Sequence, residues 1–341
     1  MAKHPTSVIG IDFGRYATKA VLIQHKGGRF DITHYAVREL TAPLETAEQV
    51  HLEVQALLAT MGGSAKDAAI SVSGGDSIIR IIEQPETPRD LLRNAIRLNG
   101  QSLLNQDVKS YVLDCSLIPT TDIHQGRDQR KYLIGGIPQK RVDMFDEAFK
   151  KGRAKLQAVQ LSPVSTFNAF EFANPQFFKN EAFMLVDIGH ESSTIGVGAK
   201  EELILVRTLE YGGNALMQSL IQSGQPDRKT ALQTLEEGED EIMETARISL
   251  SALTREISSS IGFFEGRREE SVGRVFVSGG AAASRSVLQI MAEELRMPCM
   301  AWNPLEGCGI ALAEERKTDL AFDVVNLHAA CGVAIEYLKG S

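Results

Sequence analysis

Two stretches of this sequence share one pattern, and their repetition decides the fold. Residues 9–23 read IGIDFGRYATKAVLI, and residues 183–197 read FMLVDIGHESSTIGV. Each stretch consists of an apolar strand, an Asp-x-Gly turn and a returning apolar strand, and a third strand pattern follows it. Asp12 and Gly14 stand where Asp187 and Gly189 stand in the second copy. This internal repeat predicts an α/β protein with two similar lobes that face one another across a cleft.

Length, charge and cysteine content limit the classes of protein to which this chain can belong. The chain has 341 residues, a formal net charge of -8 and 43% hydrophobic residues, which predicts an ordinary globular protein of about two domains. The negative charge argues against nucleic acid as a partner. Cysteine is sparse and forms no CxxC pair, so we expect scattered reduced thiols rather than a zinc site or a disulfide framework. The cysteines are Cys115, Cys299, Cys308 and Cys331.

We find neither the pattern of a signal peptide nor that of a membrane-spanning helix in the sequence. The opening residues, MAKHPTSVIG, contain no apolar core of a signal peptide. No run approaches the roughly 18 uncharged apolar residues that a spanning helix needs. We therefore expect a cytoplasmic protein that reaches a membrane only through partners.

The repeated turns suit a nucleotide. A glycine lets the backbone turn tightly and present N–H groups to phosphate oxygens, as Gly14 and Gly189 would. An aspartate at a strand end holds magnesium, often through water, which is the role expected of Asp12 and Asp187. Lys19 lies on the returning strand and could neutralise phosphate charge. One such turn is usually an ordinary hairpin, but two at matching places predict a clamp around the phosphates.

A third turn follows the apolar strand in VFVSGGAAA, residues 275–283. Gly279 and Gly280 permit close approach, and the helix that begins there favours a phosphate or ribose oxygen. The stretch is neither a P-loop nor a dinucleotide-binding GxGxxG motif. Taken alone it is as well explained by a plain strand-to-helix turn.

These motifs resemble those of the actin-like ATPase superfamily. GIDFGRYATK resembles its first phosphate motif, LVDIGHESST its second, and VFVSGGAAA its adenosine motif. Over nearly the whole chain the sequence is similar to the PilM family of type IV pilus assembly proteins, including the turn LVRTLEYGGNALMQSL with Gly212 and Gly213. The resemblance implies an actin-like fold with two lobes around a nucleotide cleft and an αβ inset in the first lobe, as in PilM and FtsA.

The resemblance also implies a domain organisation. We expect residues 1–77 to form the first-lobe core, 78–160 an inserted αβ subdomain and 161–182 the return to the first lobe. The second-lobe core would comprise 183–216 and 271–325, with a small helical upper subdomain at 217–270. Residues 326–341 would form a C-terminal helix that packs on the first lobe.

The same resemblance implies cofactors and partners. The expected ligands are ATP or ADP with Mg²⁺, held in addition by Ser192, Ser193 and Thr194 of the second turn. The expected partner is the cytoplasmic N-terminal peptide of a PilN-like membrane protein, in the inner-membrane platform of a type IV pilus or a related secretion system. Pilus motor components and self-association are further possibilities that the family allows.

Departures from the family pattern concern the cleft. Arg15-Tyr16-Ala17 stands where the family usually has serines, and two roles are open for Arg15: it binds phosphate, or it fills the site and excludes phosphate. No residue has both the type and the context of a general base, so the protein is at most a weak ATPase. The alternatives are an active ATPase or small-molecule kinase, and an FtsA-like or actin-like filament protein. His190, just after the second turn, could contact a phosphate, but it is expected to face solvent.

Overall fold

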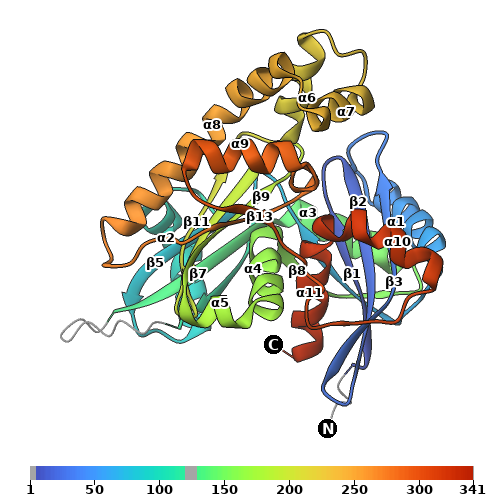
Figure 1. Cartoon of the computed structure of the whole chain (residues 1–341). Coiled ribbons are helices and arrows are strands. Elements are labelled where there is room, and N and C mark those ends of the chain that lie inside the picture. The colour runs from blue at the N-terminus through green and yellow to red at the C-terminus, as the bar shows by residue number, and fades with distance from the viewer. Residues whose placement is uncertain (1–4, 120–128, 341) are drawn as a thin grey trace.

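The first lobe is built on a six-stranded sheet with the order β14-β3-β2-β1-β4-β8. The computed structural model describes residues 5–119 and 129–340, and Figure 1 shows their arrangement. β1 and β4 lie in the middle of the sheet and are almost wholly buried, as expected for apolar strands covered on both faces. The strands are β1 (Ser7–Phe13), β2 (Ala17–Lys26), β3 (Arg29–Glu39), β4 (Asp67–Val72), β8 (Lys155–Leu161) and β14 (Gly309–Ile310).

Helices cover both faces of this sheet. α1 (Ala47–Met61) and α3 (Gln139–Lys150) pack on one face, and α4 (Ser162–Ala173) and α11 (His328–Lys339) lie on the other. The sequence fixes the start of α1, because Thr46 and Gln49 form a reciprocal capping box. The last helix of the chain thus returns to the first lobe, where it contacts β1, β2 and β4.

The inset is a three-stranded antiparallel sheet with the order β5-β7-β6, covered by α2 (Arg89–Leu104). Its strands are β5 (Ile78–Pro85), β6 (Tyr111–Leu117) and β7 (Gln129–Pro138). The expected range of 78–160 for this subdomain needs a correction, because β8 pairs in parallel with β4 of the six-stranded sheet. β8 thus adds a third parallel strand next to β1 and β4. No local pattern in the β8 sequence indicates this partner.

The second lobe is built on a five-stranded sheet with the order β11-β10-β9-β12-β13. β9, β10 and β11 repeat the antiparallel arrangement of β1, β2 and β3, and β12 lies parallel to β9 as β4 lies parallel to β1. The strands are β9 (Ala182–Ile188), β10 (Ser193–Ala199), β11 (Glu202–Leu209), β12 (Val275–Ser278) and β13 (Cys299–Ala301). The sequence repeat is therefore a repeat of sheet topology.

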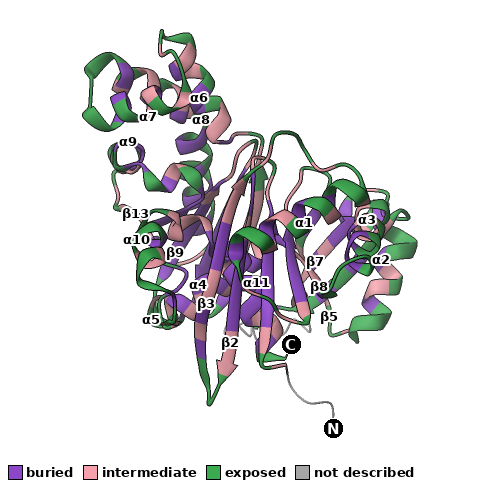
Figure 2. Ribbon diagram, turned by 90° about the vertical axis from the view of Figure 1, so that its right-hand side faces the viewer, coloured by how far each residue is buried: buried purple, intermediate pink, exposed green. Residues whose placement is uncertain are grey.

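Helices of the second lobe extend beyond its sheet. The long helix α8 buries one apolar stripe from Ile242 to Phe264, as its periodicity predicts, and with α6 and α7 it forms the projection at the top of Figure 1. Figure 2 shows that burial is concentrated in the sheets and on the inner helix faces. Its helices are α5 (Pro175–Asn180), α6 (Gly213–Gln222), α7 (Arg228–Glu237), α8 (Asp240–Glu265) and α9 (Arg285–Leu295), with the 3₁₀ turn η1 (Gly280–Ala283). The remaining helix, α10 (Glu314–Asp323), packs on the first lobe and is followed by the 3₁₀ turn η2 (Val324–Asn326).

Among the described residues, no single helix is both long and apolar enough to cross a membrane. The segments Glu314–Asn326 and His328–Lys339 reach the required length and composition only together, and a bend of 91° separates them.

Candidate functional site

The two hairpins place their key residues in equivalent positions. Lys19 lies directly opposite Asp12 in the register of β1 and β2, and Thr194 lies directly opposite Asp187 in that of β9 and β10. Each pair is seven positions apart, so the spacing predicts the cross-strand contact. A side chain on Gly189 would come within 2.8 Å of the carbonyl oxygen of Ser192, and one on Gly14 would meet Ala17 in the same way. The matching turns thus require glycine at the same place.

Asp12 is bound by the lysine of its own hairpin. The Nζ atom of Lys19 donates to Oδ2 of Asp12 at 2.8 Å, and the side chains are 17% and 7% exposed. A pair this well shielded is screened less than a surface pair. Lys19 therefore neutralises a carboxylate of the protein rather than reaching into the cleft.

Asp187 is bound by residues from two other elements. Its Oδ1 atom accepts a hydrogen bond from Ser278 at the end of β12 and lies 3.0 Å from Nε2 of His328, the first residue of α11. The other ring nitrogen of His328 lies 3.0 Å from the carbonyl oxygen of Val325. Both ring nitrogens thus face acceptors, an arrangement that suits the doubly protonated, cationic ring.

The electrostatics agree with this geometry. Burial acts to raise the pKa of Asp187, but the charge and hydrogen bond of His328 outweigh burial and hold that pKa below its usual range. Burial likewise acts to lower the pKa of His328, and the Asp187 carboxylate raises it above the usual histidine value. Asp12 and Lys19 also influence the pKa of His328, so the four groups form one charge cluster between the lobes.

The tips of the two hairpins touch. Nε of Arg15 donates to Oε2 of Glu191 at 3.0 Å, and these side chains are 47% and 53% exposed. Beside them the ring of Tyr16 stacks on that of His190, with centroids 4.9 Å apart. His190 is therefore partly buried against the first lobe, and the expectation that it faces solvent is wrong.

The upper subdomain reaches the same place. The guanidinium of Arg228, at the start of α7, lies 4.7 Å from the centre of the Tyr16 ring, on which it forms a cation–π contact. Burial and the neighbouring Arg228 charge lower the pKa of His190, so this ring is neutral near pH 7. Three parts of the chain thus meet at Tyr16.

The glycine turns surround the second hairpin. The N–H of Gly213 donates to the carbonyl of Gly189 at 2.8 Å, so α6 begins at this turn. Gly279 has a φ of +86°, and a side chain there would lie 2.2 Å from the carbonyl oxygen of Ile188. Gly280 opens η1 just beyond it. The strand-to-helix turn after β12 therefore abuts the second hairpin, as the sequence predicts.

The three hydroxyl-bearing residues that follow the second turn make different contacts. Ser193 donates to the carbonyl oxygen of Tyr211 at 2.6 Å and is buried. Ser192 contributes its carbonyl to the turn by accepting from the N–H of Gly189. Thr194 lines a cavity together with Asp187. Ser192 lies in the turn and the other two residues begin β10, and their contacts lie in different places.

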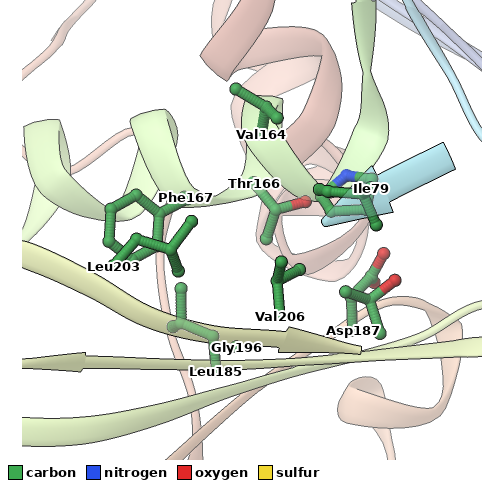
Figure 3. A pocket seen from close by; sticks show the side chains of 11 residues that line it. Ile79, Val164, Thr166, Phe167, Leu185, Asp187, Gly196, Leu203 and Val206 are labelled. Atoms are coloured by element: carbon green, nitrogen blue, oxygen red, sulfur yellow. The ribbon is translucent and has the colours of Figure 1, made fainter. Parts of the chain in front are cut away.

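That cavity lies beneath the second hairpin and is shown in Figure 3. It is lined mostly by apolar side chains of α4, β5 and β11, with Asp187 and Thr166 among the polar ones. The hydroxyl of Thr166 is buried and has no hydrogen-bond partner among the residues described. The volume is about 20 Å³, room for about one water molecule and far below the roughly 300 Å³ of a small-molecule pocket.

These observations test whether the residues fit magnesium and a nucleotide. Asp12 and Asp187 each already contact a basic side chain, and side chains from both tips occupy the space between the turns. No group of three or more His, Cys, Asp or Glu residues within 5–119 and 129–340 could hold a metal ion. As the loops lie, the residues do not fit MgATP.

Sequence reasoning identified the hairpins but missed several residues that meet there. Glu191, Arg228 and His328 were not expected at the site, and no local pattern singles them out. Glu236, near the end of α7, is exposed and joins that helix to α9. It accepts hydrogen bonds from Ser284 and from the N–H of Arg285 at the start of α9.

The fold and its repeated hairpins define an actin-like ATPase fold, as predicted. The structure of a PilM–PilN type IV pilus biogenesis complex is similar to this chain with a TM-score of 0.82 and 20% identity, and covers 98% of this chain and 99% of that one. The nucleotide-free diol dehydratase-reactivating factor has a TM-score of 0.58 and 9% identity, with 98% and 100% covered. The ethanolamine utilization protein EutJ from Carboxydothermus hydrogenoformans has a TM-score of 0.55 and 14% identity, with 97% and 90% covered.

The particular family follows from the sequence profile. The profile of the type IV pilus assembly protein PilM matches residues 10–338. The chain belongs to the PilM family, which confirms the resemblance drawn from its motifs.

Proposed function

We propose that this protein is a cytoplasmic component of the inner-membrane assembly platform of a type IV pilus or a related secretion system. In this role it binds the cytoplasmic N-terminal peptide of a PilN-like membrane protein. The observation that carries the proposal is the family match over residues 10–338. The similarity to a PilM–PilN complex over 98% of the chain, inset included, supports it.

The fold offers a place for such a peptide between the first lobe and the inset. β8 is the last strand of the six-stranded sheet, so one of its edges has no partner strand among the described residues. The inset lies beside it, because α3 contacts both β8 and β7 of the inset, and a side chain on Gly135 of β7 would lie 3.2 Å from Leu161. An extended peptide gains affinity from main-chain hydrogen bonds to a free sheet edge and specificity from adjacent apolar side chains.

The β8 edge also has apolar neighbours. Leu156 and Val159 of β8 and Met144 of α3 are partly buried against the first-lobe core. A peptide that adds to β8 could cover the parts of these side chains that the core leaves exposed. β6 is an edge strand of the inset sheet and serves as an internal comparison.

The predicted ATP or ADP, Mg²⁺ and site residues stay predictions, as do the pilus motor components and self-association. Peptide binding at β8 draws on none of them. The proposed role therefore contains no nucleotide step.

Calorimetry with a synthetic peptide tests the proposal. The peptide is the cytoplasmic N-terminal segment of the PilN-like protein from the same genome, and a scrambled peptide of equal composition is the control. We expect saturable binding of the native peptide alone. No binding, or equal binding of both peptides, would overturn the proposal.

Hydrogen exchange on the complex tests the place of binding. We expect slower amide exchange in Lys155–Leu161 when the peptide is bound, because its free edge becomes paired. Exchange in Tyr111–Leu117 should not change. Slower exchange in β6 instead of β8 would support the peptide as the partner but would show that β8 is not its binding site.

A further inference from the structure

The tips of the two hairpins carry an arginine of the kind that binds phosphate and a carboxylate that can bind this arginine in place of phosphate. Arg15 follows the first Asp-x-Gly turn, where an anion would be bound, and Glu191 follows the second. The two side chains form a 3.0 Å ion pair across the cleft. The carboxylate thus sits on the guanidinium as a phosphate oxygen would, because arginine binds both groups through the same N–H donors.

An incoming phosphate would meet two obstacles at this pair. It would have to displace Glu191 from Arg15, and the freed carboxylate would then repel a polyanion at close range. In the Tyr16–His190 stack, ring atoms fill the adjoining space. Neither ring carries a positive charge that would favour phosphate, since burial and Arg228 lower the pKa of His190.

A second contact layer lies deeper in the cleft. Oδ1 of Asp187 contacts His328 and Ser278, and Oδ2 of Asp12 contacts Lys19. A divalent cation at either carboxylate would lie beside a nitrogen donor of the protein. The cavity that Asp187 lines has a volume of about 20 Å³, which is room for about one water and not for a hydrated metal ion.

The contacts join three parts of the fold. Arg15 and Tyr16 belong to the first lobe, His190 and Glu191 to the second, and Arg228 to the upper subdomain. We propose that the hairpin tips bind one another in place of MgATP, so that the protein holds its lobes together without a nucleotide. This inference is independent of the PilN-like partner, and either proposal can fail alone.

Nucleotide titration provides the first test. Trp302 is the one tryptophan of the sequence, and its ring centre lies 6.4 Å from that of His328, so its fluorescence reports on the cleft. We expect no saturable change in fluorescence and no saturable heat in calorimetry with MgATP or MgADP up to millimolar concentration. Saturable binding by the wild type that Asp12→Ala abolishes would overturn the proposal.

Hydrogen exchange without any ligand tests the closure itself. We expect the double variant Arg15→Ser/Tyr16→Ser to exchange amides of residues 13–17 and 189–192 faster than the wild type, because the tips separate. The matched control is Arg207→Ser, which removes a similarly exposed Arg–Glu pair within the second lobe, at 3.1 Å and 42% and 47% exposure. It should leave those amides unchanged. Equal exchange in wild type and double variant would show that the tips do not hold the lobes, and would overturn the proposal.

Discussion

Nε2 of His328 lies 3.0 Å from Oδ1 of Asp187, so the last helix of the chain is tied to the second hairpin. The imidazole is 5% exposed and the carboxylate 17%. Removing one member of a buried pair leaves the other without its partner, which typically costs about 3–5 kcal/mol. We therefore expect His328→Ala to lower the free energy of unfolding by about 3 kcal/mol, measured by urea denaturation.

A double-mutant cycle separates this contact from loss of packing. Asp187→Ala and His328→Ala should together cost clearly less than the sum of the two single changes, because each removes the same interaction. Strict additivity would mean that the two side chains do not stabilise one another.

The pH dependence of stability should reveal His190. Its pKa is lowered in the folded protein by burial and then by Arg228, so on acidification the unfolded chain binds the proton first. The free energy of unfolding therefore contains a contribution that is complete above the ordinary histidine pKa of 6.5 and is lost as the pH falls through the lowered value.

Urea midpoints measured between neutral pH and a pH of about 5 test this sign. The variant His190→Asn cannot titrate in this range, so its midpoint should fall less steeply with acid than that of the wild type. Identical slopes would show that His190 has an ordinary pKa.

Gly279 should tolerate no side chain. Its positive φ is strained for other residues, on the order of 1–3 kcal/mol, and a Cβ atom would collide with the carbonyl oxygen of Ile188. Gly279→Ala should therefore destabilise the protein by at least this amount. The control is Gly262→Ala in α8, where a Cβ meets nothing within 4 Å, and where alanine should stabilise the helix by up to about 1 kcal/mol. Thermal melts that rank the variants in the opposite order would refute this account of the turn.

Glu202 should hold the inset on the second lobe. Its side chain is 0% exposed and contacts Lys131 of β7 at 2.5 Å and Arg268 at 2.7 Å. Glu202→Ala should lower the free energy of unfolding by roughly 3 kcal/mol, since it removes a buried carboxylate that binds two cations. Glu256→Ala, which breaks an exposed ion pair with Arg207, should cost no more than about 1 kcal/mol. Equal losses in urea denaturation would show that burial of Glu202 adds nothing.

The sequence predicted what local patterns encode. The two hairpins and the long helix α8 follow from spacing and periodicity, because strand register and helix faces repeat at short range. The ion pair of Lys19 with Asp12 was not predicted, since Lys19 was expected to neutralise phosphate charge. The family resemblance supplied the overall fold. The placement of β8 was missed because a parallel strand receives its partner from a distant segment.

The contacts between the lobes could not be predicted in the same way. Arg15 and Glu191 are 176 positions apart, and each occupies an exposed turn whose pattern fits many partners. His328 begins an apolar helix in which one histidine carries no signal by itself. The sequence did indicate that Arg15-Tyr16 departs from the family pattern. In the structure both residues contact the tip of the second hairpin.

The most direct test of the account is the affinity for the PilN-like N-terminal peptide, measured by calorimetry with and without MgATP. Two ligands influence one another only through a coupling free energy, and a nucleotide that does not bind has none. The account predicts saturable peptide binding with the same dissociation constant in both conditions. A peptide that fails to bind, or that binds only when MgATP is present, would contradict it.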